Sequence, residues 1–261
     1  GPQVMEGLHG VPFARPLTRM RETIEVVRLA EAGERLALDG DQIRLPLPGG
    51  EGRALRLSLR PGDEPLAIYI ASLSPRMLAL TGEVADGWLG TSFVPEGARS
   101  SMDALAEGAA RSGRTLADLD LCQGAEVAFA RDEAELHEML QRRKAGLAFS
   151  LGGMGSARTN FYNAAYARQG FADVAAESQA LWLAGRRDAA ASVIPDSMVM
   201  ATTLLGTESQ VADRLRVWED TGITQVRLYP AGETLDERLD TLGRALDLVR
   251  GLESSRSRES K

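Results

Sequence analysis

Apolar residues follow helical spacing in some parts of the chain and strand-like spacing in others. A first helix is predicted directly after Pro16, because apolar residues then recur at every third or fourth position. Four apolar or alternating runs predict strands, at residues 66–71, 86–90, 119–129 and 225–229. The regular alternation of strands and helices favours a parallel sheet with helical crossovers. The fold class is therefore α/β, either a doubly wound sheet or a (β/α)8 TIM barrel.

Three later helices are marked by capping patterns at their starts. In each, an Asp or Thr is followed three positions later by Glu or Gln, which is the spacing of a capping box. The pairs are Asp132 and Glu135, Thr207 and Gln210, and Thr234 and Glu237. Gly251 is predicted to end the last of these helices, because glycine readily adopts the left-handed backbone found after a helix.

Two segments and a tail interrupt the strand and helix rhythm. Residues 36–59 alternate in short pieces between turn sequences, which predicts a hairpin-like excursion. Residues 146–200 begin with a glycine-rich run and continue as short Ala-rich helical pieces, which we interpret as an insertion. The tail at 253–261 is Ser, Arg and Glu without apolar anchors, and we expect it to be disordered. The expected folded domain is 1–252.

The number of predicted strands is small for a complete barrel. Four core strands are predicted after a helix that itself needs a preceding strand. Because each βα unit takes roughly 30 residues, an eight-fold barrel would be short by about three units, or on the order of 90 residues. We therefore expect an incomplete barrel that lacks roughly its first three βα units.

Composition and charge exclude several classes of protein. A net charge of -7 and a pI near 5.1 argue against binding to the phosphate backbone of nucleic acids. Cys122 is the single cysteine, so no disulfide forms within the chain, and its alternating apolar surroundings predict a core position. No apolar run approaches the roughly 20 residues of a membrane helix. We expect a cytoplasmic protein, without a membrane or nucleic-acid partner and without a bound metal.

The turn after the apolar run 66–71 is the most informative candidate site. Ser74 can cap the following helix, and Pro75 suits its first position. The first-turn amides, the positive end of the helix dipole and the Arg76 guanidinium would then form a cradle for a phosphate. The alternative is an ordinary capped turn with Arg76 in solvent.

Other candidate motifs point less directly to chemistry. The run Gly152-Gly153-Met154-Gly155 lets the backbone approach a ligand but lacks the context of a dinucleotide fingerprint, so it equally suits a hinge. His9 lies in a glycine-flanked loop and is a candidate for proton transfer or for capping backbone groups. His137, in a charged helix, is expected at the surface. No residue can be assigned as the catalytic acid or base.

Three motifs taken in order resemble the luciferase-like monooxygenase family, and in particular its F420-dependent oxidoreductases. The first runs from Gly1-Pro2-Gln3-Val4 through Glu6-Gly7-Leu8-His9-Gly10 to Pro16-Leu17-Thr18-Arg19. The second joins Ile68-Tyr69-Ile70-Ala71, Pro75-Arg76-Met77 and Gly82-Glu83-Val84-Ala85-Asp86-Gly87-Trp88. The third is Gly152-Gly153-Met154-Gly155 followed by Asn160-Phe161-Tyr162. Leu8 departs from the family, in which many members carry Trp at that position.

The resemblance implies a barrel with the coenzyme at the carboxyl ends of its strands. It assigns the coenzyme phosphate to Ser72, Leu73, Ser74 and Met77, and contacts with the ring system to Pro2 and Gln3. It adds Gly153 and Met154 from the insertion.

The implied activity is hydride transfer between the deazaflavin coenzyme F420 and a small organic substrate. One alternative is an FMN-dependent monooxygenase that uses oxygen. Another is a non-catalytic fragment of such an enzyme. A homodimer is left open.

Overall fold

The computed structural model describes residues 1–58, 62 and 64–259, and side chains as far as residue 252. The chain forms two compact units, each with its own strands and helices. Unit 1 contains Gly1–Trp88 and Asp103–Leu119, and unit 2 contains Leu89–Met102 and the chain from Asp120 onward.

Unit 1 is built from helices around a short pair of parallel strands. Its strands β3 and β4 pair in parallel, with Tyr69 opposite Gly87 and Ile70 opposite Trp88. The bounds of its elements, in chain order, are α1 (Pro2–Gly7), α2 (Pro16–Glu31), β1 (Leu38–Asp39), β2 (Arg44–Leu45), β3 (Tyr69–Ile70), α3 (Pro75–Val84), β4 (Gly87–Leu89, the last residue in unit 2), α4 (Arg99–Arg111, from Asp103 in unit 1) and the 3-10 turn η2 (Leu116–Asp118).

Glu22 on α2 anchors the hairpin formed by β1 and β2. Its buried carboxylate accepts hydrogen bonds from three successive backbone amides, those of Asp41, Gln42 and Ile43, at 2.8, 2.9 and 2.7 Å. Burial alone would raise the pKa of Glu22, but the three amide donors and the nearby Arg15 hold that pKa below its usual range. The carboxylate therefore stabilises the hairpin in its ionised form.

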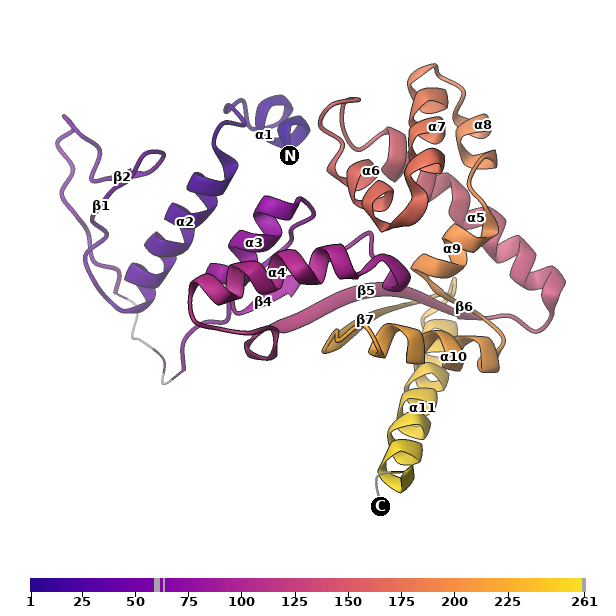
Figure 1. Cartoon of the computed structure of the whole chain (residues 1–261). Helices are drawn as coiled ribbons and strands as arrows, with labels where there is room; N and C mark the ends of the chain where they lie inside the picture. The colour runs from indigo at the N-terminus through magenta and orange to yellow at the C-terminus, as the bar shows by residue number, and fades with distance from the viewer. Residues whose placement is uncertain (59–61, 63, 260–261) are drawn as a thin grey trace. The chain divides into compact units, whose positions relative to one another are not determined.

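Helices α3 and α4 approach closely because each carries a glycine at their contact. A Cβ on Gly108 would overlap the carbonyl oxygen of Ala79, and one on Gly82 would overlap the carbonyl oxygen of Leu105. Arg114, just after α4, donates to the carbonyl oxygens of Gly82 and Ala85 at 2.6 and 2.9 Å, which satisfies acceptors at the end of α3. Figure 1 shows these helices with α2.

Unit 2 is organised around the long strand β5. Residues Cys122 to Val127 of β5 pair in parallel with β7, and Val127 to Phe129 pair in parallel with β6. The bounds of the elements are η1 (Pro95–Gly97), β5 (Asp120–Phe129), α5 (Glu133–Gly152), α6 (Phe161–Tyr166), the π-turn η3 (Ala167–Phe171), α7 (Ala172–Leu183), α8 (Arg187–Ser192), α9 (Asp196–Thr202), β6 (Leu204–Gly206), α10 (Glu208–Glu219), β7 (Gln225–Pro230) and α11 (Leu235–Glu259).

The insertion predicted at 146–200 forms the helical group from the end of α5 to α9, drawn from pink to orange in Figure 1. Its apolar side chains share one core with residues of β5 and β6. Ala148, Leu151, Ile194 and Met198 are almost fully buried there. This core packs against the carboxyl end of β5, at Ala128, and against β6, at Leu205.

The α/β class and the parallel pairing of the strands confirm the main sequence prediction. The described residues contain five parallel strands rather than the four predicted, because β6 was not recognised. That these strands form an incomplete (β/α)8 barrel, lacking roughly its first three βα units, stays a prediction. None of the helices in the described part of the chain combines the length and apolar composition that crossing a bilayer requires.

Several local predictions can be compared directly with the structure. The cap of Asp132 on the amide of Glu135 (2.9 Å) and the capping box of Thr207 and Gln210 are confirmed. The hairpin is formed by β1 and β2; Leu59, at the end of its predicted range, lies outside the described residues. The predicted helix end at Gly251 is wrong, since α11 continues to Glu259 in residues with adequate helix propensity. Residues 260–261 lie outside the described part of the chain, and disorder of the tail stays a prediction.

Replacing Gly108 by Ala tests the close packing of α3 and α4. The added methyl group would push against the Ala79 backbone, and overpacking of this kind costs about 1–3 kcal/mol of unfolding free energy. Gly243→Ala is the matched control, because a Cβ on Gly243 in α11 meets nothing within 4 Å. That change should stabilise the helix by up to about 1 kcal/mol. Urea denaturation measures both, and equal effects would contradict the packing argument.

Replacing Glu22 by Gln tests the anchor of the hairpin and its pH dependence. Because the folded pKa of Glu22 is lowered, its carboxylate stabilises the fold above the ordinary Glu pKa of about 4.3 and loses this effect as pH falls through the folded pKa. Glu22→Gln should therefore be less stable than the parent at neutral pH, with a difference that shrinks in acid. Glu25→Gln, at an exposed position of the same helix, is the control. A difference independent of pH in urea denaturation would contradict the anchor.

Candidate functional site

The turn between β3 and α3 has the local geometry that the sequence predicted. Ser74 is the N-cap of α3, with extended backbone angles, and Pro75 occupies the first turn. The Oγ atom of Ser74 accepts a hydrogen bond from the backbone amide of Met77 at 3.4 Å. The side chain of Arg76 is exposed. The turn therefore presents the start of a ten-residue helix together with an exposed positive charge.

Ser72 has a different role from the one expected of its hydroxyl group. It is 4% exposed, and its Oγ lies 2.9 Å from Oγ1 of Thr81 on α3. Its carbonyl oxygen accepts a hydrogen bond from the indole Nε1 of Trp88 at 3.0 Å. Ser72 thus holds the turn against α3 and β4 from within unit 1, and its contact with a phosphate stays a prediction.

The donor set of this turn fits an anion. The first amides of a helix have no acceptor within the helix, and they lie at the positive end of its dipole. Leu73, Ser74 and Met77, all half-buried, bring backbone and hydroxyl groups to this end, and Arg76 adds charge. Backbone amides at a helix start are a recurrent way to hold phosphate.

The remaining predicted site residues lie elsewhere in the chain. Pro2 and Gln3 belong to the six-residue helix α1 of unit 1, which has no buried residue. Gly153 and Met154 belong to unit 2, where Gly153 is the C-cap of α5 and Met154 is 37% exposed. A Cβ on Gly153 would lie 2.6 Å from Cδ2 of Phe149, so this glycine permits close packing. The structure groups Ser72, Leu73, Ser74 and Met77 in one turn, and the binding roles of all eight residues stay predictions.

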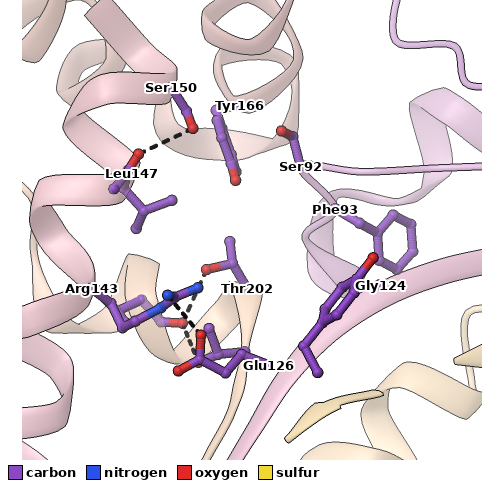
Figure 2. A pocket seen from close by; sticks show the side chains of 13 residues that line it. Ser92, Phe93, Gly124, Glu126, Arg143, Leu147, Ser150, Tyr166 and Thr202 are labelled. Carbon is purple, nitrogen blue, oxygen red and sulfur yellow. Dashed lines mark hydrogen bonds and ion pairs between the residues drawn. The ribbon is translucent and has the colours of Figure 1, made fainter. Parts of the chain in front are cut away.

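Unit 2 contains a cavity of about 340 Å³ that sequence reasoning did not identify. Its walls come from β5, α5, α6, the end of α9, β7 and the segment after β4, as Figure 2 shows. The lining residues are Ser92, Phe93, Gly124, Glu126, Arg143, Gly146, Leu147, Ser150, Tyr166, Val199, Thr202, Thr203 and Tyr229.

An ion pair forms the charged part of this cavity. Glu126 on β5 and Arg143 on α5 approach to 2.7 Å between Oε2 and Nη1 (Figure 2). Burial raises the pKa of Glu126 above its usual range, and the guanidinium of Arg143 offsets only part of this rise. The Glu126 carboxyl is therefore easier to protonate than an ordinary glutamate.

Tyr166 and Ser92 line the cavity near each other (Figure 2). Burial raises the pKa of the Tyr166 phenol, and a hydrogen bond with Ser92 and the charge of Arg143 oppose the rise. Ser92 has a φ of 53°, in the left-handed region that residues other than glycine rarely adopt. Such backbone strain persists only where surrounding contacts enforce it.

Gln169 supplies the contacts that enforce the conformation of Ser92. Its Nε2 donates to the carbonyl oxygens of Ser92 and Ala165 at 2.7 and 3.0 Å, and its Oε1 accepts from the amide of Val94 at 2.8 Å. Gln169 itself is 7% exposed and sits in the kink η3. This one amide therefore ties the segment after β4 to the inserted helices.

The sequence carried one signal for the cavity. Glu126 places a charge in the second half of strand 119–129, between apolar residues, and a buried carboxylate in a strand demands a partner. Arg143 gave no such signal, since it resembles the other charged residues of a surface helix.

Comparison with known proteins defines the class of the molecule. Parallel strands joined by helical crossovers are typical of α/β enzymes of the barrel and doubly wound types. The chain belongs to the luciferase-like monooxygenase family, whose sequence profile matches residues 1–225.

Two relatives illustrate the similarity in sequence. The chain is 36% identical over 233 residues to a Mycobacterium tuberculosis protein whose name proposes a coenzyme F420-dependent oxidoreductase, covering 87% of this chain and 66% of that protein. It is 28% identical over 247 residues to the 5,10-methylenetetrahydromethanopterin reductase of Methanolobus tindarius, covering 94% of this chain and 71% of that enzyme. The chain thus spans about two thirds of the length of these relatives.

The structural comparison agrees in fold. The coenzyme F420-dependent tetrahydromethanopterin reductase from Methanopyrus kandleri superposes with a TM-score of 0.66 at 20% identity, covering 95% of this chain and 70% of that one. At this level of identity the likeness establishes a shared fold.

Replacing Gln169 by Ala tests the support of the cavity wall. The change leaves the buried amide of Val94 without its acceptor, which costs about 1–3 kcal/mol of unfolding free energy. Gln141→Ala, at an exposed position of α5, should change stability by less than about 0.5 kcal/mol. Urea denaturation measures both variants. A Gln169 variant as stable as the Gln141 variant would show that the wall does not depend on this amide.

Proposed function

We propose that the chain is part of an oxidoreductase that transfers a hydride between coenzyme F420 and a small organic substrate. Membership of the luciferase-like family and the F420-dependent relatives support this proposal. The observation that carries it is the turn after β3, where the Ser74 cap, the first amides of α3 and the exposed Arg76 offer a phosphate site. In barrel enzymes of this class, strand carboxyl ends carry the active site.

The residues of this turn would hold the coenzyme through its phosphate. The backbone amide of Arg76 and the hydroxyl proton of Ser74 would hydrogen-bond to phosphate oxygens, and the Arg76 guanidinium would supply a charge-assisted contact. Leu73 and Met77 would contribute backbone groups, while buried Ser72 would position the turn through Thr81. F420, when bound, supplies or accepts the hydride, and the protein supplies orientation and electrostatics.

The other predicted contacts complete the proposal. Pro2 and Gln3 would contact the coenzyme ring system, and contacts of Gly153 and Met154 with the coenzyme stay predictions. Cytoplasmic location and a homodimer also stay proposals.

A monooxygenase that uses reduced FMN and oxygen is the second candidate. The family as a whole is named for monooxygenases, which supports this alternative. FMN also carries a phosphate, so the turn after β3 suits both coenzymes. The relative affinities of the protein for F420 and FMN distinguish the two candidate functions.

Titrating the chain with F420 while following coenzyme fluorescence tests the proposal. We expect saturable binding with a Kd of tens of micromolar or lower, and much weaker binding of FMN. Ser74→Ala should weaken F420 binding about tenfold, because it removes a hydroxyl donor to the phosphate and a cap that orders the helix start. Tighter binding of FMN than of F420 would favour the monooxygenase.

Two controls identify the phosphate as the cause. The deazaflavin nucleoside that lacks the phosphate should bind the parent and Ser74→Ala equally well. Thr207→Ala removes an equivalent cap from α10 without touching the proposed site, and it should leave F420 affinity unchanged. The proposal fails if F420 does not bind the folded chain, and the phosphate assignment fails if Ser74→Ala binds F420 as the parent does.

A further inference from the structure

We propose that the cavity of unit 2 binds a neutral organic molecule through an alcohol or carbonyl oxygen, held between Glu126 and Arg143. The inference rests on the proposed function only in naming this molecule as the substrate. The volume of the cavity, about 340 Å³, falls within the range of about 300–1,000 Å³ that is usual for small-molecule sites.

The ion pair favours neutral ligands because it balances the charge of the cavity. Among its lining residues, Glu126 supplies one negative charge and Arg143 one positive charge. An anionic ligand at the guanidinium would be repelled by Glu126, and a cationic ligand at the carboxylate would be repelled by Arg143. Separating a partly buried pair leaves one charge without its partner, which is costly. An alcohol can accept a hydrogen bond from Arg143 and donate one to Glu126 without separating the pair, and a carbonyl oxygen can accept from Arg143 alone.

Hydrogen-bonding groups around the pair suit an alcohol or carbonyl. Arg143 carries five N–H donors, so its bond to Glu126 leaves others for a ligand oxygen. The hydroxyls of Thr202 and Thr203 donate to backbone carbonyls of α9, at 3.1 and 2.7 Å, and therefore present lone pairs to the cavity. Together these residues can both donate to and accept from one ligand oxygen.

The rest of the wall is apolar or aromatic. Phe93, Leu147 and Val199 cover the sides, and the ring of Tyr166 projects into the cavity (Figure 2). Gly124 lies beside Tyr229, and a Cβ there would lie 2.8 Å from the tyrosine ring, so glycine keeps this wall free of a side chain. An apolar body with one polar group matches such a lining.

A series of probes with the same ring and different charges tests this inference. The probes are cyclohexanol, cyclohexanone, cyclohexanecarboxylate and cyclohexylammonium, titrated into the full chain near neutral pH and followed by protein-observed NMR. We expect the two neutral probes to bind the parent protein more tightly than either charged probe. Shifts should concentrate on cavity residues such as Leu147 and Val199.

Substitutions of the pair should change the charge preference in opposite directions. Glu126→Gln leaves Arg143 without its carboxylate, so cyclohexanecarboxylate should bind about tenfold more tightly than to the parent. Arg143→Gln leaves Glu126 alone, so cyclohexylammonium should gain by about the same factor. Arg142→Gln removes the same charge from the neighbouring exposed position of α5 and should change neither preference. A purely structural ion pair would not produce opposite shifts.

The outcomes separate this inference from the proposed function. It is overturned if no probe binds the folded parent, if both substitutions leave the charge preference unchanged, or if saturating F420 displaces the neutral probes competitively. The last outcome would indicate that the coenzyme itself binds in the cavity. If Glu126→Gln does not fold, as judged by its urea transition, Arg143→Gln carries the test, because the Arg143 side chain is 45% exposed. Probe binding without F420 binding would sustain the cavity site and reject the coenzyme.

Discussion

The backbone pairing of β5 is the interaction on which unit 2 depends. This ten-residue strand pairs in parallel with β7 along one stretch and with β6 along the next, so the three strands share one direction. Parallel strands require a crossover between them, and here the crossover after β5 is the group of helices from α5 to α9. The chain must therefore return over the strands, and α5 brings Arg143 back to Glu126. The cavity is a consequence of this crossover.

Unit 1 depends on close contacts between helices rather than on a long strand. Its parallel strands pair over only two residues each, which gives them few hydrogen bonds of their own. Stability comes instead from the approach of α3 to α4 and from side chains that satisfy backbone groups, such as Glu22 and Arg114. The turn before α3 gains rigidity from the same source, because the carbonyl of Ser72 is held by Trp88. A rigid turn can bind an anion without first being ordered.

Features of the fold that depend on neighbouring residues could be predicted from the sequence. The caps at Ser74, Asp132 and Thr207 require only residues three positions apart, and the structure has all of them. The strand β6 was missed because its three residues, Leu204 to Gly206, are too few to show a period.

The features that escaped prediction depend on partners distant in the sequence. The hydrogen bond between the hydroxyl groups of Ser72 and Thr81, nine residues apart, was not predicted, and a contact of Ser72 with a phosphate stays a prediction. The cavity required Arg143 to meet Glu126 and Gln169 to reach Val94, which no local pattern contains. Single-sequence reasoning therefore recovered the Ser74 cap of the turn before α3, a local motif, and missed the cavity, which tertiary packing creates.

The two candidate sites differ in the forces that would select their ligands. At the turn before α3, exposed Arg76 and the start of the helix attract negative charge. This attraction weakens as salt is added, because charges are screened over about 8 Å at physiological ionic strength. In the cavity, paired charges cancel, and a neutral ligand would gain mainly from burial of its apolar body and from directed hydrogen bonds. Those terms respond little to salt. A charged coenzyme and a neutral substrate would thus be selected by different physical interactions within one chain, so that neither site needs to resemble the other.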